Sequence, residues 1–125
     1  MVKKKMKEIT WLPDEQEHDY PSAESFLRII YNEDRVAQMM AGLRGAAIVE
    51  FKAKDIFIAS QLPLLGLSNS HVARDQKKIR KGLGLSPLLL VRDEQNGKVV
   101  IADGYHRLCA IHAFNEDALI QCKII

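Results

Sequence analysis

The sequence has few of the features that define several familiar classes of small protein. It contains only two cysteines, Cys109 and Cys122, which excludes a miniprotein held together by disulfides. Its longest apolar run, Pro87 to Val91, is far shorter than the roughly 20 residues that a membrane-spanning helix needs. No apolar segment follows the basic start of the chain, so no signal peptide is expected. These absences predict a cytoplasmic protein with reduced thiols and no membrane partner.

The chain also lacks an excess of charge of one sign. Its 18 basic and 16 acidic residues leave a net charge of +2, whereas strong nucleic-acid binders usually show a larger imbalance. The charges are nevertheless clustered along the chain. They form a basic tail (Lys3, Lys4, Lys5 and Lys7), an acidic stretch (Asp14, Glu15, Glu17, Asp19 and Glu24) and a second basic cluster (Arg74, Lys77, Lys78, Arg80 and Lys81).

What is present is a sequence of 125 residues with 47% hydrophobic residues, enough for one compact domain. Apolar spacing predicts a helix that starts at Pro21-Ser22, with Ser22 as its N-cap and with Phe26, Ile29 and Ile30 on its buried face. Further helices are expected over 33–43, over a short turn from 54, over 71–81 behind a Ser70 cap, and over 105–114.

Strands are expected over 47–51, 87–92, 98–102 and 119–125, with Asn96-Gly97 as a hairpin turn between the second and third of them. Because helices and strands are mixed without strict alternation, the fold class is α+β. We expect a helical N-terminal extension over 1–45 and a domain over 46–125.

One segment, Val100 to Arg107, has the pattern of a binding site. A strand ends, Gly104 makes a turn and a helix begins at once, so the first N–H groups of that helix point at a natural anion site. Arg107, and His106 when protonated, lie in the first turn, where a cation opposes the helix dipole at a cost of about 0.3–1 kcal/mol. A bound anion would offset this cost. The structural alternative is that Asp103 is only an N-cap, Gly104 only a turn residue and Arg107 only a surface charge.

The order strand, Asn-Gly turn, strand, Asp103-Gly104-Tyr105-His106-Arg107, apolar helix and closing strand resembles the ParB/sulfiredoxin-like superfamily, including small bacterial ParB-like proteins. Sulfiredoxins have Gly-Cys-His-Arg at this turn, where it holds ATP phosphates. ParB proteins have Gly-Glu-Arg-Arg, which holds CTP phosphates, and related free-serine kinases have Asp-Gly-His-His-Arg. The resemblance covers about residues 47–125 and implies a mixed sheet packed by helices.

The resemblance also implies roles for individual residues. Gly104, Tyr105, His106 and Arg107 would bind the phosphates of a nucleotide such as ATP or CTP, or of another phosphorylated molecule. His106 would serve as a hydrogen-bond donor or proton relay. Independently of the resemblance, Asp103 would position Mg²⁺ beside a bound phosphate, since Mg²⁺ often takes one carboxylate plus phosphate oxygens, or would act as a base. Any turnover would then be phosphoryl transfer or nucleotide hydrolysis.

The sequence departs from these families in ways that limit the comparison. Tyr105 stands where sulfiredoxins have their catalytic cysteine, which argues against sulfinate reductase activity, and Cys109 is expected in the core. No helix-turn-helix domain of the ParB kind is recognised, and the histidine spacing offers no zinc site built by the protein.

Two other functions stay open. The basic helix face could support the charge of a phosphorylated ligand, or it could serve a nucleic-acid-binding or nuclease-like module; its residues are Arg74, Lys77, Lys78 and Lys81. Alternatively, the domain is an interaction module whose N-terminal extension forms a homodimer or docks a partner.

Overall fold

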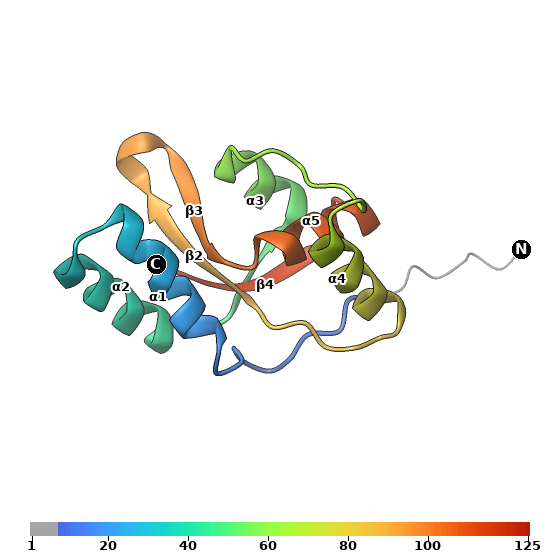
Figure 1. The fold of residues 1–125 in the computed structure, drawn as a ribbon, viewed down its shortest axis with the longest axis horizontal. Helices are drawn as coiled ribbons and strands as arrows, with labels where there is room; N and C mark the ends of the chain where they lie inside the picture. Colours follow the sequence, from blue (N-terminus) through green and yellow to red (C-terminus); the bar gives the residue numbers. More distant parts are fainter. Residues whose placement is uncertain (1–7) are drawn as a thin grey trace, which may run out of the picture.

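A computed structural model describes residues 8–125, and the basic tail over 3–7 lies outside that range (Figure 1). Five α-helices and four β-strands form the described part of the chain, which confirms the α+β class. The helices are α1 (Asp19–Ile30), α2 (Glu33–Gly45), α3 (Ala53–Ser60), α4 (Ser70–Arg80) and α5 (Tyr105–Phe114). The strands are β1 (Val49–Lys52), β2 (Leu88–Asp93), β3 (Lys98–Asp103) and β4 (Leu119–Ile124).

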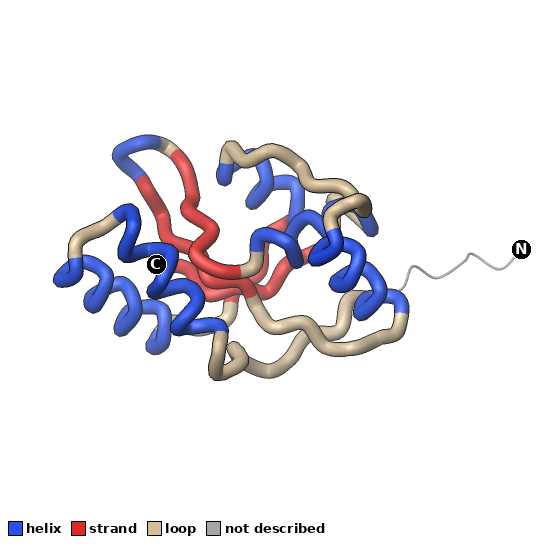
Figure 2. Tube along the Cα trace, viewed as in Figure 1, coloured by secondary structure: helices blue, strands red, loops and turns tan. Residues whose placement is uncertain are grey.

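The strands form one mixed sheet in the order β1-β4-β2-β3 (Figure 2). Strand β4 runs antiparallel to β1 and parallel to β2, while β2 and β3 form an antiparallel hairpin. The hairpin turn contains a short 3₁₀ helix, Glu94–Asn96, followed by Gly97 at φ 65°. The expected hairpin is therefore confirmed, but its loop spans four residues, from Glu94 to Gly97, rather than Asn96-Gly97 alone. Gly97 supplies the positive φ, whereas Asn96 belongs to the 3₁₀ helix.

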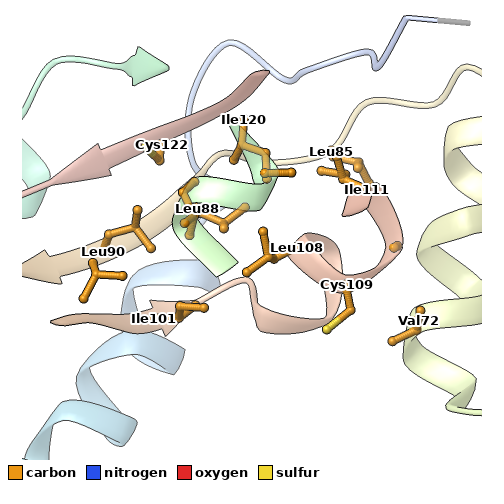
Figure 3. Packing of buried hydrophobic residues seen from close by; sticks show 14 of the residues in the cluster. Val72, Leu85, Leu88, Leu90, Ile101, Leu108, Cys109, Ile111, Ile120 and Cys122 are labelled. Atoms are coloured by element: carbon orange, nitrogen blue, oxygen red, sulfur yellow. The ribbon is translucent and has the colours of Figure 1, made fainter. Parts of the chain in front are cut away.

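Helices cover both faces of the sheet, so the protein has two layers of core. Alternate residues of a strand point to opposite faces, and the core residues of β2 are divided in this way. The face covered by α3, α4 and α5 contains most of the large buried side chains (Figure 3), among them Leu88, Leu90, Ile101, Leu108, Ile111 and Ile120. The face covered by α1 and α2 contains Ala23, Leu27, Val36, Met40, Leu43, Leu89 and Val91.

The core between the sheet and helices α1 and α2 shows how the N-terminal extension packs. Residues of α1 and α2 share a core with β2 and β3, so both helices are part of the sheet packing rather than a free arm. The boundary between 45 and 46, and a homodimer through this extension, stay predictions.

The buried face of α1 differs from the prediction. Ala23 and Leu27 are fully buried, whereas Phe26, Ile29 and Ile30 are 43%, 84% and 49% exposed. This helix carries apolar residues on two faces, and local spacing does not show which face meets the sheet. Ala23 and Leu27 instead share a core with residues of β2 and β3, which are distant in sequence.

Two predicted helix starts are also wrong. Helix α1 begins at Asp19, after His18, and Pro21 is accommodated in its first turn, where an N–H has no intrahelical acceptor. The N-cap of α4 is Asn69 rather than Ser70, because the Asn69 Oδ1 accepts hydrogen bonds from the N–H groups of His71 (3.0 Å) and Val72 (3.2 Å). In contrast, Asn32 caps α2 as expected. None of the helices within 8–125 has the length and hydrophobicity to span a bilayer.

Candidate functional site

The turn between β3 and α5 is built around Gly104. Its φ of 109° lies in a region that L side chains rarely adopt, and a Cβ at this position would lie 2.6 Å from the Leu88 Cγ. Helix α5 then begins at Tyr105, and its first bond to the cap is the Leu108 N–H donating to the Gly104 carbonyl at 2.9 Å. The N–H groups of the residues between them have no acceptor within the helix.

Gly104 is the N-cap of this helix and no side chain of the described residues caps it, so the proposed capping role of Asp103 is wrong. The Asp103 carboxylate is directed to Arg107 instead. As a result, the N-terminus of α5 keeps both its free donors and the positive end of its dipole.

These donors border a polar pocket of about 220 Å³. The pocket brings together four segments of the chain, which are the stretch before α1, one face of α4, the loop before β2 and the start of α5. Its lining consists of Gln16, His18, Arg74, Asp75, Lys78, Gly84, Leu85, Ser86, Asp103, Gly104, Tyr105, His106 and Arg107. Three of these side chains are cationic and two are carboxylates, and the helix dipole adds to the small positive excess. The sequence-predicted turn residues therefore lie together in one pocket.

Only part of the basic cluster on and after α4 lies at the pocket. Arg74 and Lys78 line the pocket, whereas Lys77 and Lys81 are exposed outside its lining. Of the four basic residues expected to support the charge of a ligand, only Arg74 and Lys78 therefore lie at the pocket. The other two face solvent.

The Arg107 guanidinium contacts other groups of the protein. Its Nη2 donates to the Asp103 Oδ2 at 3.0 Å and to the Pro87 carbonyl at 3.3 Å, and its Nη1 lies 3.9 Å from the Asp19 Oδ1. The Nε is buried and has no hydrogen-bond partner in the described part of the chain. A role as phosphate clamp stays a prediction, and it requires the ligand to compete with Asp103 for this guanidinium.

The Arg107 guanidinium lies next to a cluster of three carboxyl groups. Oxygen atoms of Glu15, Asp19 and Asp103 all lie within 4.8 Å of one another. Burial raises the pKa of Asp103, an effect that Arg107 opposes. Burial, and secondly the charge of Asp19, raise the pKa of Glu15 to about 8. Near neutral pH the Glu15 carboxyl therefore retains its proton beside Asp19, Asp103 and Arg107.

This balance bears on the expected Mg²⁺ at Asp103. Carboxylate oxygens suit Mg²⁺. However, Arg107 already bonds to the Asp103 carboxylate, and Glu15 holds a proton that a metal would have to displace. The residues do not fit a resident Mg²⁺, and a Mg²⁺ that arrives with a nucleotide stays a prediction.

The Glu15 carboxyl leads to a prediction about pH and stability. Its pKa is about 8 in the folded protein against 4.5 ordinarily, so between these values the folded state holds a proton that the unfolded chain has lost. Stability contributed by this proton is complete at low pH and falls as pH rises through that window. Glu15→Gln mimics the protonated form, so it should raise Tm by several degrees at about pH 9 and have little effect at about pH 5.

Thermal unfolding followed by circular dichroism across this pH range measures the effect. Glu17→Gln, at an exposed position two residues away, is the matched control and should leave the pH dependence unchanged. A Glu15→Gln protein that tracks the wild type at every pH would show that Glu15 is ionised in the folded state.

His106 and Tyr105 shape the outer part of the pocket. The His106 ring lies 4.8 Å from the His71 ring, measured between centroids, and burial lowers the pKa of His106. A neutral imidazole can donate and accept a hydrogen bond, which suits the expected proton relay. The Tyr105 hydroxyl donates to the Pro63 carbonyl and so ties α5 to the loop before α4.

The cysteines lie in the core, as expected. Both are fully buried and free. Burial raises the pKa of the Cys109 thiol, and it raises that of Cys122 to about 12. Neither thiol has the lowered pKa of a nucleophile.

Sequence reasoning missed several residues of the site. Glu15, Gln16, His18 and Asp19 belong to a stretch whose sequence indicates only an acidic character, and no pattern singles out Asp75. The one signal in the sequence is the density of carboxylates over 14–24. The chain matches no family model, no curated protein and no solved structure. The ParB/sulfiredoxin-like resemblance therefore stays a prediction.

Proposed function

We propose that the pocket at the N-terminus of α5 binds the phosphate groups of a nucleotide or of another phosphorylated molecule, in a cytoplasmic domain of the ParB/sulfiredoxin-like kind. The observation that carries this proposal is the convergence of the uncapped start of α5 with Arg74 and Lys78 of α4 in one polar pocket. Free N–H donors, a helix dipole and two cations from another helix are the features that bind phosphate in proteins.

Each part of the pocket has a role in this proposal. The N–H groups of Tyr105, His106 and Arg107 would donate to phosphate oxygens, and Arg74 and Lys78 would balance the charge. The Nε–H of Arg107, which is buried and has no partner within residues 8–125, is a further donor beside the same site. His106 in its neutral form would hold or transfer a proton, and Asp103 would act as a base once its bond to Arg107 is released.

The size of the pocket limits what it can hold. Its volume of about 220 Å³ is below the roughly 300–1,000 Å³ of pockets that enclose a whole drug-sized ligand. The phosphates would therefore lie inside, while the rest of the ligand would lie at the mouth of the pocket. If there is turnover, positioning and electrostatic stabilisation favour phosphoryl transfer or hydrolysis, because the site offers no activated nucleophile.

Calorimetry with ATP, CTP, ADP and inorganic pyrophosphate, each with and without Mg²⁺, tests the proposal. Arg74→Ala and Lys78→Ala should each weaken binding about tenfold, since each removes a charge-assisted contact of about 1.4 kcal/mol. Lys77→Ala removes the same kind of charge from the exposed side of α4 and should leave affinity unchanged. No binding by the wild type, or equal binding by all three variants, would refute the proposal.

A nucleic-acid-binding function is the second candidate, and the exposure of Lys77 on α4 and of Lys81 directly after it favours this function. Phosphate-backbone binding weakens steeply with salt, and it would depend on Lys77 as much as on Lys78. Gel shifts across a salt series with the same three variants separate this function from binding of a small phosphorylated ligand in the pocket.

A further inference from the structure

Among residues 8–125, no strand pairs with the outer edge of β1, so the sheet is open there. This strand pairs with β4 on one side and is the last in the order β1-β4-β2-β3. Beyond the end of the ladder, the Ala53 N–H donates to the Ala118 carbonyl at 2.9 Å in the same register. Hydrogen-bonded and non-bonded residues alternate along an antiparallel pair. The backbone groups of Val49 and Phe51 therefore face β4, and those of Glu50 and Lys52 face outward.

The side chains of β1 alternate between the two faces of the sheet. Val49 and Phe51 are 37% and 38% exposed, and Phe51 borders an apolar groove of about 410 Å³ between α3 and the β2–β3 hairpin. Glu50 and Lys52 project from the opposite face of the sheet and are exposed. The edge thus presents one acid, one base and two apolar side chains along a strand of four residues.

We propose that this edge binds a second copy of the chain, with the two β1 strands antiparallel about a two-fold axis at Phe51. This register places Glu50 of each copy opposite Lys52 of the other, so both cross-strand pairs join opposite charges. The Lys52 N–H of each copy donates to the Glu50 carbonyl of the other. The two Phe51 residues form the non-bonded central pair, where side chains approach most closely.

The same features explain why the partner is a copy of this chain rather than any exposed strand. Short strands and charged side chains normally protect a sheet edge from indiscriminate pairing. Shifting the register by one residue would place Phe51 opposite a charged residue, and a shift by two would lose the Glu-Lys pairs. The order Glu50-Phe51-Lys52 is complementary to itself in the antiparallel direction alone. With only four residues in each strand, the dimer is a transient one.

Sedimentation velocity from about 10 μM to about 1 mM, the range of a small transient interface, measures the association. Glu50→Lys and Lys52→Glu each place like charges in both cross-strand pairs, so each variant alone should dimerise at least about tenfold more weakly than the wild type. An equimolar mixture of the two restores opposite charges in both pairs and should dimerise like the wild type. The double variant Glu50→Lys/Lys52→Glu should do the same.

Glu24→Lys on α1 and Lys81→Glu after α4 carry the same charge changes at exposed positions and should leave the association unchanged. Circular dichroism of each variant checks that the fold is kept. A wild type that stays monomeric throughout the range would overturn the proposal. So would a dimer that withstands both single reversals, or one that the mixture does not restore.

Discussion

Gly104→Ala is expected to lower Tm by about 10 °C or more, because two separate costs add at this position. The backbone there has φ 109°, and a left-handed conformation costs an L-residue about 1–2 kcal/mol. The added Cβ would also lie 2.6 Å from the Leu88 Cγ and 3.0 Å from the Arg107 Nη2. Overpacking of a buried side chain such as Leu88 costs a further 1–3 kcal/mol, approximately.

Two other glycines separate these costs. Gly97 has φ 65° but open space where a Cβ would lie, so Gly97→Ala should show the backbone cost alone. Gly45 has neither a positive φ nor a close neighbour, so Gly45→Ala should leave Tm nearly unchanged. Thermal unfolding of the three variants under one condition gives the comparison. A Gly104→Ala protein no less stable than Gly97→Ala would mean that Leu88 and α5 adjust freely, and that the turn does not fix the start of α5.

Arg107→Ala is expected to destabilise the protein by about 3–5 kcal/mol, the usual cost of removing one partner of a buried ion pair. The side chains of Arg107 and Asp103 are each 15% exposed, and that of Asp19 is 1% exposed. Removing the guanidinium leaves the carboxyl cluster without its cation and breaks the bond to the Pro87 carbonyl. The loss should be larger at about pH 8 than at about pH 5, because carboxyls whose pKa values are raised can take up protons at the lower pH.

Urea unfolding at both pH values measures this loss. Arg80→Ala removes the same side chain from an exposed position at the end of α4 and should have an effect within about 0.5 kcal/mol of zero. If Arg107→Ala were as stable as the wild type at both pH values, the guanidinium would not be compensating the cluster. It would then be free to serve the ligand alone.

The prediction for Arg107 also explains why the ligand test depends on Arg74 and Lys78. A variant that loosens the start of α5 would lose ligand binding whether or not Arg107 touches the phosphate. Arg74 is exposed and Lys78 partly so, and neither bonds to the carboxyl cluster. Arg74 does contact His71, with its Nη2 3.4 Å from the His71 Nδ1. Substitution of Arg74 or Lys78 therefore changes the charge of the pocket without removing a bond to the carboxyl cluster.

Sequence patterns correctly predicted those helices and turns that depend on interactions between residues close in sequence. The bounds of α5 agree with the sequence prediction at both ends, since Gly104 must precede the helix and its apolar residues extend to Phe114. The hairpin depends on Gly97, and the start of α2 depends on the Asn32 side chain, which bonds to the Arg35 N–H at 2.9 Å. Each of these signals acts over a few residues, and the sequence displays it directly.

The buried face of α1 shows where local reasoning ends. Phe26, Ile29 and Ile30 are more hydrophobic than Ala23, yet Ala23 and Leu27 meet the sheet. Which side of a helix packs depends on the shape of the surface opposite it, and that surface is formed by strands far along the chain.

The sequence by itself determined the turn at Gly104 and the helix that follows it, because backbone conformation is set by neighbouring residues. The tertiary structure alone decided which charges surround that turn. It placed Arg74 and Lys78 at the pocket, and it brought Asp19 and Glu15 to the local pair of Arg107 and Asp103. Electrostatic interactions depend on distance in space, and packing of α1 and α4 against the rest of the fold sets those distances.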